Sequence, residues 1–454
     1  MYDLQGLAAD ALEAALAAGA SNAEAYAQDA DGIEVRVYEG EVEALTESAE
    51  RGVGVRAWID ARAGYAYGTD LGDEGVRAIA AGAVEAARVA DPDEFAAPPE
   101  GSGDGAPDVE GLHDPTLAGW GTESKVKLAQ EVERAARADE RVVAIEDTVY
   151  ADEAQRVAIA SSSGARGAYE STSCYAYARA IAADDDDDRQ TGLGFEVARG
   201  PGSLDAGAIG GEAADRAVSL LGASKPPSRT CPVVLDQTVA ASFIGFIGGV
   251  LCADAVQRGR SPFAGRLGDE IASAALTLTD DGLDPEGPAS APFDGEGTPH
   301  GRTPLIDAGT LRTYLHDSYT ARREGDGQSS TGNAARAGYR SPPTVSTSNL
   351  VIAEGDRTLD ELLAEASDGV YVTDVAGLHS GVNPVSGTFS VGASGRRIEN
   401  GELTAPHTEF TIASDLPKML AAVLAASRPS RWVPFGGSVK APALLIGEMA
   451  VGGS

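Results

Sequence analysis

The chain has 454 residues, with 70 Asp or Glu against 35 Lys or Arg, so its formal net charge at pH 7 is −35. Because 43% of the residues are apolar, the chain can bury a sizeable core, which excludes disorder as its main state, and its length is typical of two or three domains. The strong negative field repels nucleic acid and anionic lipid, so we expect neither as a partner.

The acidic surplus predicts a halophilic protein. Only five of the basic residues are lysine, and the rest are arginine. In concentrated salt, charges are screened over a few ångströms, so a surface rich in carboxylates stays hydrated without strong self-repulsion.

Cysteine usage and the first residues predict a cytoplasmic location. Cys174, Cys231 and Cys252 are too few and too far apart for a disulfide framework, which indicates a reducing compartment. The opening sequence MYDLQGLAAD lacks the basic start and apolar run of a signal peptide.

Hydrophobic periodicity predicts a helix, a sheet and a second helix in the first 90 residues. Apolar residues recur at helical spacing over 4–18 and again over 73–90. Between these helices lie short β-rich runs separated by Gly and Asp, at 23–28, 33–38, 53–59 and 63–67. Such runs favour an antiparallel sheet.

Residues 91–116 are so rich in Pro, Gly and Asp that we expect a linker or long surface loop there. After this segment the sequence predicts further helices and strands. The helices are expected at 122–138 and 204–222, and the strands near 142–150, 155–161 and 168–182.

The acidic run Asp184–Asp188 resembles a calcium loop only superficially. An EF-hand that began at Asp184 would need Gly at its sixth position and Glu at its twelfth, where this chain has Arg189 and Phe195. We therefore expect a solvated hairpin tip.

The second half begins after the KPPS sequence at 225–228. A strand, CPVVLD, is followed by 17 uncharged residues at 237–253, which is short of the ~20 that a membrane-spanning helix needs, so we expect a buried helix. The remainder is β-rich, with hairpin signals at Ala308-Gly309 and Asn400-Gly401 and helices near 358–366 and 414–426.

These elements predict an α+β fold with two domains. Residues 1–225 form an N-terminal α+β domain, made of segments 1–92 and 116–225, with an antiparallel sheet and flanking helices. Residues 229–454 form a β-rich C-terminal domain.

Four segments of the second half together resemble one family, because their order and spacing are specific. They are GRSPFAGRLGD at 259–269, APFDGEGTP at 291–299, STGNAAR at 330–336 and SGVNPVSGTFSVGASGRRIENGEL at 380–403. With GVRAWIDARAGYAYGTDL at 54–71 and the region 141–182, they resemble the TldD/PmbA (TldD/TldE) family over nearly the whole chain except the linker.

The resemblance implies that the catalytic motif of this family is missing here. In the TldD-type metalloprotease subunit, a helix before the R-G-x-S-x-F-x-G segment carries His-Glu-x-x-x-His, and a cysteine near the C-terminus completes the zinc site. Two imidazoles one helical turn apart would bind zinc, and the glutamate would polarise water. In the register of Arg258-Gly259, the histidine positions are Ile244 and Gly249, the glutamate position is Gly245, and the cysteine position is near Gly436.

The sequence therefore resembles the PmbA/TldE-type branch, and we expect no catalytic, cofactor-binding or metal residues in this chain, with zinc in a TldD-like partner. The implied function is a non-catalytic, cytoplasmic subunit of a TldD-type metallopeptidase that acts on unfolded or flexible peptides in proteolysis or peptide maturation. The subunit would form a heterodimer with that partner or a homodimer with itself.

Two alternatives remain open. The chain could be an active metallopeptidase with unconventional ligands such as Cys252, Asp254 and His316, or a homodimeric peptide-binding protein without protease activity.

Overall fold

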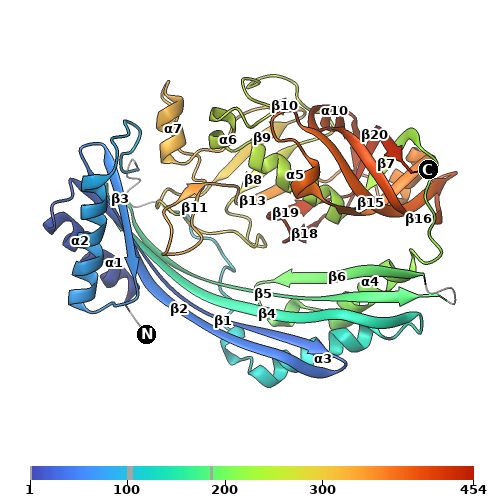
Figure 1. Cartoon of the computed structure of the whole chain (residues 1–454), viewed down its shortest axis with the longest axis horizontal. Helices are drawn as coiled ribbons and strands as arrows, with labels where there is room; N and C mark the ends of the chain where they lie inside the picture. The colour runs from blue at the N-terminus through green and yellow to red at the C-terminus, as the bar shows by residue number, and fades with distance from the viewer. Residues whose placement is uncertain (1–2, 100–105, 185–187, 454) are drawn as a thin grey trace.

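The computed structural model describes residues 3–99, 106–184 and 188–453, and it confirms the α+β class. A long curved sheet from the first half of the chain lies beneath a β-rich body from the second half, with α3 and α4 on the sheet's outer side (Figure 1).

The first sheet is antiparallel throughout, in the order β3-β2-β1-β4-β5-β6. Its strands are β1 (Asn22–Tyr38), β2 (Glu41–Ile59), β3 (Arg62–Gly68), β4 (Val142–Ser161), β5 (Arg166–Ala183) and β6 (Arg189–Ala198). The helices of this half are α1 (Leu4–Ala17), α2 (Asp73–Val89), α3 (Thr122–Ala136) and α4 (Ala206–Val218), with 3₁₀ turns η1 (Leu117–Gly119) and η2 (Pro201–Ser203). The sheet therefore draws strands from both sides of segment 91–116.

The strands run longer than the sequence predicted. β1 and β4 are each one continuous strand where two were expected. Gly32 does not form a turn: it lies inside β1, where a Cβ would be 3.1 Å from the Asp152 carbonyl oxygen of β4. The start of β2, residues 41–51, is exposed on both faces. It therefore has no alternation of buried and exposed residues of the kind that indicates a strand. β6 was not predicted either.

Segment 91–116 is attached to the body of the protein. Its described residues, 91–99 and 106–116, contain no helix or strand. The Arg322 guanidinium donates hydrogen bonds to the carbonyl oxygens of Phe95, Ala97 and Pro98. Of the acidic run, residues 185–187 lie outside the described residues, and the strands on either side, β5 and β6, are hairpin partners.

Two six-stranded sheets and a small two-stranded one build the second half. Their orders are β10-β9-β8-β13-β19-β18, β16-β15-β14-β7-β20-β17 and β11-β12, and an added β16–β20 pairing joins five strands of the second sheet into a ring. Most neighbours are antiparallel, whereas β13–β19 and β14–β7 are parallel.

The bounds of these strands are β7 (Arg229–Leu235), β8 (Leu278–Asp281), β9 (Arg302–Asp307), β10 (Thr310–Leu311), β11 (Ala334–Ala335), β12 (Thr344–Val345), β13 (Asn349–Ile352), β14 (Asp368–Ala376), β15 (Thr388–Glu399), β16 (Glu402–Asp415), β17 (Val423–Ala426), β18 (Arg431–Val433), β19 (Ser438–Ala441) and β20 (Leu444–Gly452). The helices are α5 (Gln237–Val250), α6 (Ala253–Gln257), α7 (Ser318–Glu324), α8 (Leu359–Ala366), α9 (Leu378–Gly381) and α10 (Leu416–Ala421).

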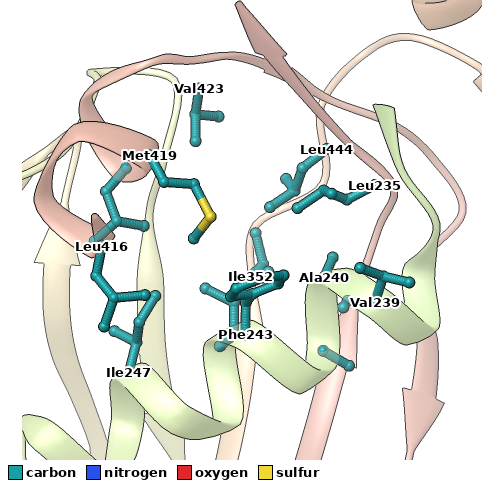
Figure 2. Close-up of a cluster of buried hydrophobic side chains, with 14 of the residues drawn as sticks. Leu235, Val239, Ala240, Phe243, Ile247, Ile352, Leu416, Met419, Val423 and Leu444 are labelled. Carbon is teal, nitrogen blue, oxygen red and sulfur yellow. The ribbon is translucent and has the colours of Figure 1, made fainter. Parts of the chain in front are cut away.

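The uncharged segment at 237–253 forms α5, a buried helix as predicted. The Asp236 side chain caps it by accepting a hydrogen bond from the Thr238 N–H. Side chains of α5 such as Phe243 and Ile247 belong to a core cluster that also contains Met419 of α10 (Figure 2). None of the helices in the described part of the chain is long and apolar enough to cross a lipid bilayer.

The predicted helix at 414–426 is wrong over most of its length. β16 continues to Asp415, α10 has only six residues, and β17 follows at Val423. β17 pairs with β20, so strand pairing overrides the helical propensity of this Ala- and Leu-rich segment. The hairpin signals at 308–309 and 400–401 are confirmed: all four residues have positive φ, from 44° at Ala308 to 84° at Gly309.

Candidate functional site

The structure brings together two of the four positions at which the family resemblance places zinc chemistry. Gly245 of α5 lies against the loop that carries Gly436, and a Cβ on Gly245 would be 2.6 Å from the Gly436 carbonyl oxygen. Gly436 itself has a φ of 80°, which favours glycine. The helix and the C-terminal loop therefore meet backbone to backbone, with no room for a side chain at 245.

The other two positions do not share a face of α5. The Ile244 side chain is buried in the core, whereas a Cβ on Gly249 would meet no atom within 4 Å. Five residues on an α-helix correspond to a rotation of ~140°, which explains why the two point in different directions. In this chain the two positions therefore lie on different sides of α5.

These residues do not fit a zinc ion. Glycine and isoleucine side chains carry no nitrogen, oxygen or sulfur that could coordinate a metal. Across residues 3–99, 106–184 and 188–453, no three His, Cys, Asp or Glu side chains gather as a metal site.

Of the three unconventional candidate ligands, Cys252 and His316 are buried and lie near each other along the backbone, whereas Asp254 is partly exposed. Cys252 forms a β-bridge with Leu315, the neighbour of His316. Burial raises the pKa of the Cys252 thiol, whose Sγ lies 3.5 Å from the Gly248 carbonyl oxygen. Asp254 is partly exposed and lies 3.9 Å from Arg258, and burial lowers the pKa of His316.

The family-like segments 291–299 and 330–336 meet the first sheet through a buried ionic network. Arg56 of β2 donates to Glu24 of β1 and to Glu296, at 2.9 Å in each case. Arg336 pairs with the other oxygen of Glu24 and donates to the Gly295 carbonyl oxygen at 2.6 Å. Both glutamates are almost fully buried. Two cations and two anions therefore hold the two halves of the chain together.

The sequence analysis used the segments 54–71, 291–299 and 330–336 only to identify the family resemblance, and it assigned no role to their charged residues. Arg56, Glu296 and Arg336 are far apart in the sequence, and no spacing rule connects them. The available signal was the presence of Arg or Glu inside otherwise Gly-, Ala- and Pro-rich segments.

Asp294 and Glu296 have pKa shifts in opposite directions. Burial raises the pKa of Asp294, and the neighbouring Glu296 raises it further, against hydrogen bonds from three backbone N–H groups. Burial would also raise the pKa of Glu296, but the Arg56 charge and hydrogen bonds from Ser318 and Arg56 bring it below its usual range.

Beside this network lies a polar cavity of about 170 Å³ between the two halves. The first sheet contributes Tyr26 and Tyr169, and the second half contributes the remaining walls. These walls are Ala289, Ala291, Phe293, Asp294, Gly295, His300, Asn333, Ala334, Ala335, Arg336, Ser346, Thr347 and Ser348.

Family models match three consecutive parts of the chain. Residues 23–87 match the PmbA/TldA metallopeptidase domain 1, residues 115–221 the central domain, and residues 228–453 the C-terminal domain.

Relatives match this chain over almost its full length or over somewhat more than half of it. The metalloprotease PmbA of Escherichia coli O157:H7 is 28% identical over 443 residues, which cover 96% of this chain and 94% of that protein. A metalloprotease TldD homolog of Haemophilus influenzae is 29% identical over 275 residues, covering 57% of this chain and 55% of that protein.

Solved structures share the fold. A Thermotoga maritima protein described as a candidate modulator of a DNA gyrase has a TM-score of 0.89 and 26% identity, covering 99% of this chain and all of that one. TldE from Thermococcus kodakarensis has a TM-score of 0.89 at 21% identity, covering 98% of this chain and all of that one.

Proposed function

We propose that this chain, which belongs to the PmbA/TldD metallopeptidase family, is a non-catalytic PmbA/TldE-like subunit that pairs with a TldD-like subunit carrying the zinc. The observation that carries the proposal is the contact between Gly245 and Gly436. Where a catalytic subunit would need a general base and a metal ligand, this chain has two backbones in contact.

The substitution is physically coherent. A glutamate at 245 would need space that the Gly436 carbonyl oxygen occupies, and a histidine at 244 would replace a side chain of which only 1% is exposed. Burying an imidazole there without hydrogen bonds would cost stability. The helix is thus built for packing, and packing is compatible with a chain that leaves the chemistry to its partner.

Similarity to both subunit types supports a paired assembly. The chain is similar along its length to PmbA proteins and over more than half of its length to a TldD homolog. Two subunits with one fold can meet across a pseudo-two-fold axis, as identical subunits do across a true one. The partner would supply zinc and the activated water, and this chain would help to enclose unfolded or flexible peptides in the cytoplasm.

Metal content of the purified chain tests the non-catalytic assignment. After dialysis, elemental analysis should find no stoichiometric zinc, and the chain alone should show no chelator-sensitive peptidase activity. A TldD-like subunit purified in parallel is the matched control and should retain zinc. One zinc retained per chain would contradict the proposal and favour the unconventional ligands.

A further inference from the structure

The polar cavity between the two halves of the chain has no role in the function proposed above. Two of its lining residues, Ala289 and Ala335, are exposed, so the cavity opens to the surface beside β11. Its lining also includes Tyr26 of β1 and the loop residues Asp294 and His300. Ligand sites occur preferentially at such boundaries between two structural units.

His300 contributes an uncommitted hydrogen-bonding group. Its ring lies against Gly282, where any side chain would collide with the imidazole. Burial lowers the pKa of His300 to about 4, so the ring is neutral at pH 7, with one N–H donor and one acceptor nitrogen. No hydrogen bond joins this ring to the described residues. The hydroxyl groups of Ser346 and Thr347 add further capacity at the same wall.

The cation at the cavity is already fully engaged. Arg336 pairs with Glu24 and donates to the carbonyl oxygens of Gly295 and Ser341. Such a guanidinium has little capacity left for an anionic ligand, so the described lining residues offer the cavity no free positive charge.

Asp294 is the acidic group with remaining capacity. Its Oδ1 accepts N–H groups from Glu296 and Thr298, at 2.9 and 3.0 Å, whereas Oδ2 accepts only the Ala334 N–H, at 3.0 Å. A carboxylate oxygen can accept two hydrogen bonds, so Oδ2 keeps one free position. No ion pair joins Asp294 to a lysine or arginine in the described structure, and burial together with the neighbouring Glu296 raises the pKa of its carboxyl group.

We propose that this cavity binds a small molecule that carries a primary ammonium group, with the size of a small amino acid. The ammonium group binds Asp294, and the rest of the molecule hydrogen-bonds to His300 and to the hydroxyls of Ser346 and Thr347. A cation at this position favours the ionised form of the buried carboxyl group and pairs with it. Because the ligand contacts Tyr26 and the loops above it, binding also links the two halves of the chain.

Calorimetry and thermal melting of the full chain, at constant sodium chloride, test this proposal with two matched sets of probes. Glycine, L-alanine and ethanolamine carry a primary amine, whereas L-lactate and propionate have similar size without one. The amines should bind with measurable heat and raise the melting temperature as their concentration rises. Lactate and propionate should do neither.

Two variants locate the site. Asp294→Asn removes the group that can carry a negative charge and should weaken amine binding at least tenfold. Ala289→Trp places a bulky side chain at the exposed mouth and should have the same effect without touching a buried group, so the test survives if the first variant fails to fold. The proposal is wrong if no amine binds, because the cavity then holds water only. It is also wrong if lactate binds equally well, because the amine is then not what is recognised, or if Ala289→Trp leaves the affinity unchanged, because the amine then binds elsewhere.

Discussion

A Cβ on Gly245 would lie 2.6 Å from the Gly436 carbonyl oxygen, whereas a Cβ on Gly249, one turn along the same helix, would meet no atom within 4 Å. The two glycines therefore play different roles. Gly245 permits α5 to touch the C-terminal loop, and Gly249 is an exposed helix residue without a packing role.

This difference predicts opposite effects of one substitution. Gly249→Ala should stabilise the protein by about 0.5–1 kcal/mol, because alanine loses less conformational freedom than glycine in a helix and meets no obstacle here. Gly245→Ala should destabilise it, since the loop at Gly436 must move to make room. Urea unfolding of both variants checks the prediction, and equal effects would show that the contact has no energetic weight.

A triple substitution tests whether the metal-binding motif of the TldD-type subunit can be restored in α5. The triple variant Ile244→His, Gly245→Glu and Gly249→His should fold poorly or remain free of stoichiometric zinc. The positions diverge around α5, and the fourth ligand near Gly436 would still be absent. Retention of one zinc per folded chain through dialysis, measured by elemental analysis, would refute this.

The buried ionic network of Arg56, Glu24, Glu296 and Arg336 should contribute more to the free energy of unfolding than any surface ion pair. Glu24→Gln removes the carboxylate shared by Arg56 and Arg336 and leaves buried positive charge uncompensated, so we expect a loss of about 3 kcal/mol or more. The control is Glu399→Gln, because Glu399 pairs with Arg397 at the surface, and it should cost less than about 1 kcal/mol. Denaturant unfolding compares them, and similar losses would mean that the network does not hold the two halves together.

The contribution of His300 to the stability of the fold should decrease at acidic pH. Burial lowers its pKa from 6.5 to about 4, so between these pH values the unfolded chain binds a proton that the folded chain does not. Stability from this group is present above pH 6.5 and is lost as the pH falls towards 4, by an amount on the order of 3 kcal/mol.

Asp280 acts in the opposite direction and must be separated from His300. Burial raises the pKa of Asp280 from 3.8 to about 6, so the folded chain binds its proton more tightly and gains stability as the pH falls through this window. The difference in unfolding free energy between the wild type and His300→Asn isolates the histidine, because both proteins keep Asp280. That difference should shrink from pH 7 to pH 4, and a constant difference would contradict the assignment.

Salt should stabilise the fold. With a net charge of −35, repulsion extends further as the Debye length grows from ~3 Å at 1 M to ~30 Å at 0.01 M. The melting temperature should therefore rise between about 0.1 and 2 M potassium chloride. A constant melting temperature would contradict a halophilic surface and would direct attention to a cationic partner for the acidic residues.

Local sequence patterns predicted the helices and strands that are buried on one face or on all sides. They failed where pairing with a strand distant in the sequence determines the secondary structure. The charge-free segment at 237–253 was sufficient to predict α5 as a buried helix. The Ala- and Leu-rich segment at 414–426 indicated a helix, but pairing of β17 with β20 made part of it a strand. Exposed residues 41–51 of β2 gave no signal at all.

The same limit applies to the sites. The glycines at 245 and 436 could be singled out from the sequence only through the family resemblance, and their contact could not be foreseen from spacing. The pairing of Glu24 with Arg336, more than 300 residues apart, follows from how the two halves dock. The division into domains 1–225 and 229–454 stays a prediction.

The assembly itself is the most direct test of the proposed function. Mixing this chain with a TldD-like subunit, and measuring molecular mass by light scattering together with the peptidase rate, should give a heterodimer that cleaves a flexible peptide faster than the TldD-like subunit alone. The activity should be abolished by a chelator and should require the partner's zinc. If the two chains stay separate and the TldD-like subunit cleaves equally well without this one, the chain is not its accessory subunit.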